Sequence, residues 1–199
     1  MINILLAGVG GQGTVLAAKV LAQAALEKGW QVRTAETIGM AQRGGNVVSH
    51  VRMGSDGEEV LAPLVAEGTA DVIVAFEPAE AARVLPYLAP TGVLVTATTP
   101  LQPVTAALAK HAYRAEEIVG NIAASLEGSQ ATFVPVDDAA LCSELGSRKA
   151  LNTLMLASAL SLGRVPLSLD DLRSAIRACV KPRFVDLNLQ AIEVAAGRA

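Results

Sequence analysis

The sequence has 199 residues, and we expect residues 1–199 to form a single domain. Hydrophobic residues make up 52% and aromatic residues only 3%, so the core must consist of Ala, Val and Leu. The formal net charge of −3 and the few aromatic side chains exclude a basic nucleic-acid surface, and no apolar run reaches the ~18 residues of a membrane span.

The cysteine content limits which cofactors the chain can hold. Cys142 and Cys179 are its two cysteines and do not form a C-x-x-C pair. Two thiols cannot by themselves supply an all-cysteine iron–sulfur cluster or zinc site, so we expect small, buried or half-buried helix residues. Residues 1–6 lack a basic region and are interpreted as a strand rather than a signal peptide, which predicts a cytoplasmic protein.

The N-terminal third predicts a strand, a helix and a second strand. Residues 2–7 are apolar, residues 14–27 repeat apolar positions at helical spacing, and residues 30–35 form the next strand. Lys28 and Gly29 are typical of a helix C-terminus. The size of this unit is that of a nucleotide-type fold.

The following segment interrupts the regular pattern. Residues 36–45 are too few for a crossover helix, and residues 46–54 alternate like a strand. We therefore expect this third strand to run antiparallel, in a mixed sheet.

Alternating strands and helices then resume, and the last third is helical. We expect strands over 70–76, 91–99 and 131–138, with Pro135 indicating an edge or a strand end. The expected helices cover residues 78–88, 116–126, 148–162, 169–180 and 184–196, and Ser168 has the character of an N-cap. The predicted fold class is a three-layer α/β/α, Rossmann-like fold with a mostly parallel mixed sheet and a helical C-terminal third.

The first motif is a glycine-rich loop between the first strand and helix. Gly8, Gly10 and Gly13 spell G-x-G-x-x-G, and the following helix N-terminus can receive an anion. Glu36 follows the predicted second strand, where a dinucleotide fold places its ribose-binding acid. Binding of NAD or FAD is therefore one interpretation, and a glycine turn that only packs helix on strand is another.

The second motif is the loop over residues 39–50. Arg43 stands beside Gly44 and Gly45, an arrangement that suits a phosphate or carboxylate clamp, and Gln42 adds an amide donor. The alternative is a solvated hairpin loop whose arginine pairs with a surface acid. His50 and His111 have no obvious acidic partner, and we expect both to be solvated or structurally bonded.

Polar residues also end two of the central strands. Glu77 follows one strand, and Thr96, Thr98 and Thr99 end the next, at the edge where open α/β sheets bind ligands. Helix capping explains these positions equally well.

Taken together, four stretches resemble the gamma-domain family of 2-oxoacid:ferredoxin oxidoreductases, closest to the small (beta) subunits of its indolepyruvate branch. The resemblance covers nearly the whole chain, and its most specific marks are residues 10–13 and 42–45. The four stretches are GVGGQGTVLAAKVLAQAAL, AETIGMAQRGGNVVSHVRMG, ADVIVAFEPAEAARVLPYL and VKPRFVDLNLQAIEVA.

The resemblance implies an oxidative decarboxylation of a 2-oxoacid to an acyl-CoA. Thiamine diphosphate, Mg²⁺ and iron–sulfur clusters would then lie on a large alpha-type partner subunit, through which ferredoxin takes the electrons, with coenzyme A as co-substrate. Two absences agree with this division of labour: a cysteine cluster motif, and the G-D-G sequence with paired asparagines that marks a thiamine diphosphate site. We expect no metal held by this chain, no nucleic-acid partner and no membrane partner.

The implied site consists of the two glycine motifs. The resemblance assigns contacts with the shared active site to Gly10, Gly11, Gln12, Gly13, Arg43, Gly44 and Gly45, with Gln42 and Arg43 as candidate catalytic contributors. Arg43 could stabilise a substrate carboxylate or a coenzyme phosphate. The competing interpretations are a free-standing NAD(P)-binding protein and an assembly module without a catalytic role. A subunit should also expose apolar side chains near the two loops.

Overall fold

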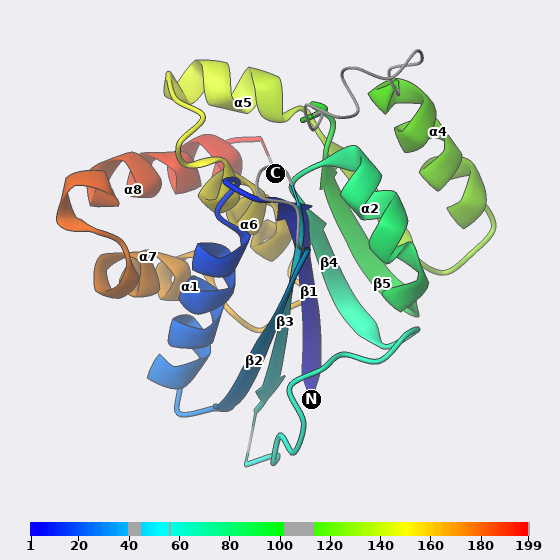
Figure 1. Ribbon diagram of the computed structural model, residues 1–199. Coiled ribbons are helices and arrows are strands. Elements are labelled where there is room, and N and C mark those ends of the chain that lie inside the picture. The colour runs from blue at the N-terminus through cyan, green and yellow to red at the C-terminus, as the bar shows by residue number, and fades with distance from the viewer. Residues whose placement is uncertain (40–44, 56, 102–113, 199) are drawn as a thin grey trace.

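The computed structural model describes residues 1–39, 45–55, 57–101 and 114–198, and these form a sheet between two layers of helices (Figure 1). The described strands form one sheet of six, in the order β2-β3-β1-β4-β5-β6. The predicted three-layer fold class is confirmed. The strands are β1 (Ile2–Val9), β2 (Gln31–Ile38), β3 (Asn46–Gly54), β4 (Ala70–Ala75), β5 (Leu88–Ala97) and β6 (Thr132–Val136).

Strand β3 makes the sheet mixed, as predicted. It pairs antiparallel with both β1 and β2, whereas β1, β4, β5 and β6 are parallel to one another. The connection between β2 and β3 is too short for a crossover helix, so the chain can only return antiparallel. Pro135 lies in β6, which is an edge strand, where its missing N–H costs no ladder bond.

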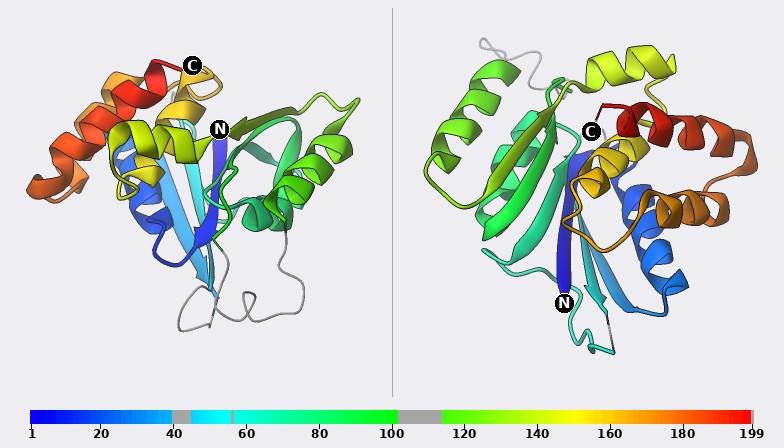
Figure 2. Two further views of the ribbon diagram at one scale, coloured as in Figure 1. Left: turned by 90° about the horizontal axis from the view of Figure 1, so that it is seen from above. Right: turned by 180° about the vertical axis from the view of Figure 1, so that it is seen from behind.

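The helices divide between the two faces of the sheet. One face carries α1 and α6, with α7 and α8 packed on these two helices, and the other face carries α2 and α4 (Figure 2). The described helices are α1 (Thr14–Glu27), α2 (Pro78–Val84), α4 (Ala115–Leu126), α5 (Asp138–Leu145), α6 (Leu151–Ser161), α7 (Leu169–Cys179) and α8 (Pro182–Ala196).

Strand alternation divides the core in the same way. Ile4 and Leu6 of β1 join the cluster under α1, whereas Leu5 and Ala7 join the cluster under α2. The helices approach closely because small residues, such as the fully buried Ala18 of α1, line the contact. The core of Ala, Val and Leu inferred from composition is therefore present on both faces.

Several element predictions differ from the structure. The predicted helix over 78–88 ends at Val84, a 3₁₀ turn covers Leu85–Tyr87, and β5 already begins at Leu88. Helix α5 was not predicted, because Asp137 and Asp138 were assigned to the preceding strand. Strand β2 continues to Ile38, three residues beyond its predicted end.

Two local predictions about the helices are confirmed. Ser168 caps α7 in a capping box, in which its hydroxyl accepts from the Asp171 N–H and the Asp171 carboxylate accepts from the Ser168 N–H. Cys142 is buried in α5 and Cys179 is half-buried in α7, and both are free thiols. Burial raises the pKa of both thiols above the ordinary value.

Candidate functional site

The first motif forms the turn between β1 and α1, at the carboxyl edge of the sheet. Gly11 and Gly13 have φ angles of +100° and +84°, which residues with a Cβ rarely adopt. Gly13 is the N-cap of α1 and provides no side chain to its first turn. The backbone N–H groups of that turn therefore remain available to an anion.

Gln12 holds this turn in place through its side-chain amide. Its Oε1 accepts from the Val9 N–H at 2.7 Å, and its Nε2 donates to the carbonyl of Phe76 at 2.7 Å. Phe76 directly follows β4, so the amide fastens the glycine loop to the end of the neighbouring strand. Both ends of the Gln12 amide thus have partners within the chain, which gives this residue a structural role in addition to the binding role predicted for it.

The structure brings the two sequence motifs together at one point. The N–H of Gly10 donates to the carbonyl of Gly45 at 2.9 Å. A Cβ at Gly10 would stand 3.6 Å from the same carbonyl oxygen, which is an ordinary van der Waals contact. Gln42, Arg43 and Gly44, the other predicted members of the second motif, lie outside the described residues.

A hollow of about 560 Å³ opens beside the glycine loop. Its volume lies within the range of about 300–1,000 Å³ that is usual for small-molecule sites. Two helices begin at this hollow, α1 after Gly13 and α6 after Ala150, and neither has a side-chain cap. The described lining residues are Gly10, Gly11, Gln12, Gly13, Leu16, Thr99, Pro100, Leu101, Arg148, Lys149, Leu151 and Asn152.

The hollow contains cations that the sequence reasoning missed. Arg148 and Lys149 come just before Ala150, the N-cap of α6, and line the hollow together with the glycines. No carboxylate is among its described lining residues. Two uncapped helix N-termini and two cations give this surface the electrostatics of an anion site, for phosphate or carboxylate groups.

Asp138 anchors Arg148 to the end of β5. The Asp138 side chain is fully buried, and its Oδ2 accepts from Arg148 Nη2 at 2.8 Å. Its Oδ1 accepts from the N–H groups of Thr98 and Thr99, at 3.1 and 2.9 Å. The guanidinium of Arg148 is half exposed, so this carboxylate orients a cation that can still reach a ligand. The sequence analysis missed the Asp138–Arg148 pair because it assigned Asp138 to a strand instead of to the start of a helix.

Glu77 is a cap, as one of the two sequence interpretations held. Its Oε2 accepts from the N–H of Glu80 at 3.1 Å at the start of α2, and Oε1 accepts from the N–H of Leu101 at 3.4 Å. Burial raises the pKa of the Glu77 carboxyl above its ordinary value, against the hydrogen bonds that lower it. Because Leu101 lines the hollow, Glu77 also braces one of its walls.

His50 is structurally bonded, as predicted. It is buried on β3, its Nδ1 accepts from the N–H of Val65 at 3.1 Å, and its ring meets Tyr87 edge to face. Burial lowers the pKa of the imidazole, which keeps it neutral near pH 7. His111 lies outside the described residues.

The dinucleotide interpretation fails on the position of Glu36. This residue lies inside β2, not after it, and is exposed. The register pairs Glu36 with Ser49 of β3 and Ser49 with Leu6 of β1, so β3 separates β2 from the strand that carries the glycine loop. Two strand spacings amount to roughly 10 Å, and a ribose held at the glycine loop would not meet this carboxylate.

Exposed apolar side chains are found at the same edge of the molecule. Val15 at the start of α1 is 45% exposed, Leu101 is 45% exposed, and Ile38 at the end of β2 is 62% exposed.

Among the described residues, no three His, Cys, Asp or Glu side chains lie close enough together to hold a metal ion. Within the same residues, no helix is both long and apolar enough to pass through a bilayer.

Comparison with known proteins shows which protein family this chain belongs to. The family described as pyruvate ferredoxin/flavodoxin oxidoreductase matches residues 3–197, and this chain belongs to that family. The family expected from the two glycine motifs is thereby confirmed.

Individual relatives agree with this assignment. The indolepyruvate oxidoreductase subunit IorB of Archaeoglobus fulgidus is 38% identical over 200 residues, which cover 100% of this chain and 95% of the relative. The keto/oxoacid ferredoxin oxidoreductase gamma subunit of Geobacter sulfurreducens has the same fold, with a TM-score of 0.70 at 20% identity over 99% of this chain and 97% of that chain. A 2-oxoglutarate:ferredoxin oxidoreductase from Magnetococcus marinus, solved with 2-oxoglutarate, coenzyme A and succinyl-CoA, matches at a TM-score of 0.71 and 20% identity, over 100% of this chain and 31% of that chain.

Proposed function

We propose that this chain is the small subunit of a ferredoxin-linked 2-oxoacid oxidoreductase of the indolepyruvate type. The complex converts an aryl 2-oxoacid and coenzyme A to an acyl-CoA and carbon dioxide, and two electrons pass to ferredoxin. The observation that carries the proposal is the hydrogen bond from Gly10 to Gly45, which joins both family motifs beside an anion-binding hollow. Relatives of this type match the chain over its whole length.

The residues of this chain do not fit the redox cofactors. An iron–sulfur cluster needs thiolates, and the sequence has two cysteines on separate helices. We therefore assign thiamine diphosphate, Mg²⁺ and the clusters to a large alpha-type subunit, and ferredoxin to that subunit as well. Thiamine diphosphate supplies the decarboxylation chemistry there. The exposed Val15, Leu101 and Ile38 suit a surface that packs on this partner.

The hollow fits the phosphate groups of coenzyme A. The N-termini of α1 and α6, together with Arg148 and Lys149, offer N–H groups and positive charge to a diphosphate. From the sequence alone we propose Gln42 and Arg43 as candidate catalytic contributors, with Arg43 contacting the substrate carboxylate or a coenzyme phosphate. The chain thus binds and orients the co-substrate at the edge of an active site that the partner completes.

We treat residues 1–199 as one domain of this complex and place it in the cytoplasm. A reducing compartment is consistent with the two free thiols, which lie on different helices.

The decisive experiment is steady-state kinetics of the complex reconstituted with its large subunit. Lys149→Gln removes one charge from the hollow without breaking the Asp138–Arg148 pair, and we expect the KM for coenzyme A to rise about tenfold. The KM for the 2-oxoacid should change far less. Lys19→Gln is the matched control, because Lys19 is an exposed cation of α1 that does not line the hollow.

Two results would contradict the proposal. Saturable binding of NADH by the isolated chain would favour a free-standing nucleotide-binding protein. Unchanged assembly and turnover in both Lys149→Gln and Arg43→Ala would reduce the chain to an assembly module.

A further inference from the structure

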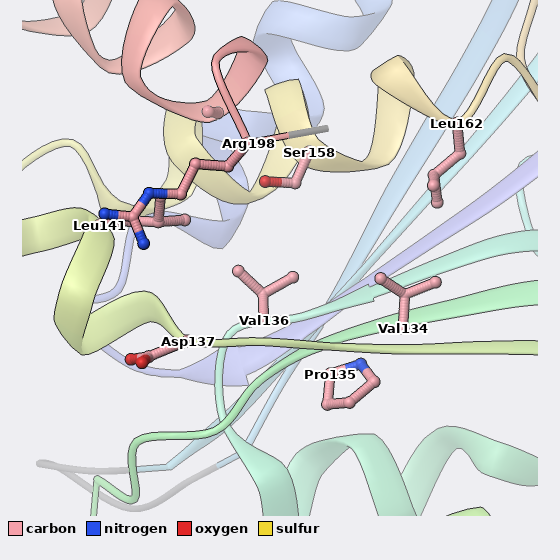
Figure 3. A pocket seen from close by; sticks show the side chains of 9 residues that line it. Val134, Pro135, Val136, Asp137, Leu141, Ser158, Leu162 and Arg198 are labelled. Carbon is pink, nitrogen blue, oxygen red and sulfur yellow. The ribbon is translucent and has the colours of Figure 1, made fainter.

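A second cavity, which we call the edge cavity, lies between strand β6 and helices α5, α6 and α8 (Figure 3). Its volume is about 370 Å³, and it shares no described lining residue with the glycine-loop hollow. The described lining residues are Val134, Pro135, Val136, Asp137, Leu141, Ser158, Leu162, Ala195 and Arg198.

Short side chains account for this space. Ser158 of α6 and Ala195 of α8 are the residues that these helices turn toward β6, and neither reaches the strand. The half-buried Val134 and Val136 pack against the core and also present apolar surface to the cavity. The buried core residue Leu141 and the 39% exposed Leu162 also line the cavity.

Polar groups gather toward one end of the edge cavity. Figure 3 shows Arg198, Asp137 and the hydroxyl of Ser158 toward that end, with Val134 and Leu162 toward the other. Arg198 Nη2 donates to Glu144 Oε2 at 2.7 Å, which leaves further N–H groups of the guanidinium for a ligand. Oδ1 of Asp137 accepts from the Ala140 N–H at 2.9 Å, which leaves Oδ2 available to accept from a ligand.

A cation and an anion at one end of an apolar cavity select a ligand with both charges. A simple carboxylic acid would meet Arg198 but would be repelled by Asp137 and Glu144. A simple amine would meet Asp137 but would be repelled by Arg198. A zwitterion satisfies both groups, and the apolar walls require that the rest of the molecule be hydrophobic.

We propose that the edge cavity binds an α-amino acid with an aliphatic or aromatic side chain. Its carboxylate meets Arg198 and Ser158, its ammonium group meets Asp137, and its side chain packs on the apolar wall of β6. This inference does not rest on the proposed function, since it uses none of the residues of the glycine-loop hollow. The 2-oxoacid with the same side chain lacks the ammonium group, so the edge cavity is not a second substrate site.

Isothermal titration calorimetry of the assembled complex tests the ligand class. We expect saturable binding of L-phenylalanine or L-leucine, and binding about tenfold weaker or worse for 3-phenylpropanoate, which lacks the ammonium, and for phenethylamine, which lacks the carboxylate. No heat from either amino acid at millimolar concentration, or equal binding of 3-phenylpropanoate, would overturn the proposal.

Three variants locate the binding in this cavity. Asp137→Asn keeps the cap of α5, because asparagine caps helices equally well, but removes the charge that holds the ammonium group. Ser158→Leu fills the space from α6. Both should weaken amino-acid binding about tenfold or more, whereas Glu144→Gln, which frees Arg198 from a competing carboxylate, should not weaken it. Binding that survives Ser158→Leu at full strength would show that the amino acid sits elsewhere.

Discussion

Replacing single glycines of the first loop separates backbone strain from crowding. Gly11 and Gly13 both have positive φ, but a Cβ would meet different surroundings at the two positions. At Gly11 a Cβ would have no heavy atom within 4 Å. At Gly13 it would stand 2.9 Å from Nδ2 and 3.2 Å from Cγ of Asn152.

The magnitudes follow from these surroundings. Gly11→Ala should lower the free energy of unfolding only through the strain of the left-handed backbone, by about 1–2 kcal/mol. Gly13→Ala introduces the same backbone strain and must also displace the Asn152 side chain. Asn152 is 5% exposed, and its Nδ2 donates to the Gly13 carbonyl at 3.3 Å. Overpacking of this kind costs about 1–3 kcal/mol, so we expect a total of roughly 2–5 kcal/mol. For a domain whose free energy of unfolding is about 5–15 kcal/mol, this loss is easily measured.

Urea unfolding of the purified chain, followed by circular dichroism, measures both costs. The double variant Gly13→Ala with Asn152→Ala opens the crowded space, and we expect it to be less destabilised than the sum of the single changes by about 1–3 kcal/mol. Equal costs for Gly11→Ala and Gly13→Ala, or additivity of the Gly13 and Asn152 changes, would refute the crowding argument.

Three further predictions concern buried ionisable groups. Burial raises the pKa of Glu77 in the folded chain, so the stability that this carboxyl contributes is lost as pH rises from about 4.5. The melting temperature of Glu77→Gln, relative to that of the parent chain, should therefore rise between pH 4.5 and pH 7. A difference between the two melting temperatures that stays constant over this range would argue against this cause. Burial lowers the pKa of His50, so its contribution is present above pH 6.5 and is lost as pH falls below it. His50→Gln should flatten the fall in melting temperature between pH 7 and 5, and an unaltered pH profile would exclude His50 as its origin. Asp138→Asn turns an amide donor toward Arg148, and we expect it to lower the free energy of unfolding in urea by about 2–3 kcal/mol. This loss is smaller than that for a fully buried ion pair because Arg148 is half exposed. A loss under about 0.5 kcal/mol would contradict an anchoring role for Asp138.

The features that could be predicted depend on residues close together in the chain. The β1–loop–α1 unit follows from an apolar run, glycines and helical spacing, all within residues 2–27. The antiparallel β3 follows from the length of one connection. Ser168 and Asp171 form a capping box that is visible as a local pattern.

Other features could not be predicted from the sequence because the local residue patterns were ambiguous. Residues 137–138 follow a β-rich run and were assigned to that strand, although Asp137 caps a helix of its own. Glu36 lay at the expected distance after the predicted second strand, but only the strand order shows that β3 separates it from the glycine loop. Spacing along a chain does not determine which strands become neighbours.

The sequence by itself determined that a glycine-rich turn opens α1, that the sheet is mixed and that two cysteines are too few for an all-cysteine iron–sulfur cluster. Only the tertiary structure decided that Gly10 bonds to Gly45, that Asp138 of α5 joins Arg148 to the end of β5, and that an apolar cavity with a cation and an anion lies beside β6. The reason is physical: turns and helix ends depend on the conformational preferences of adjacent residues. A site, in contrast, is assembled from chain segments that meet only when the sheet orders its strands and buries its two faces.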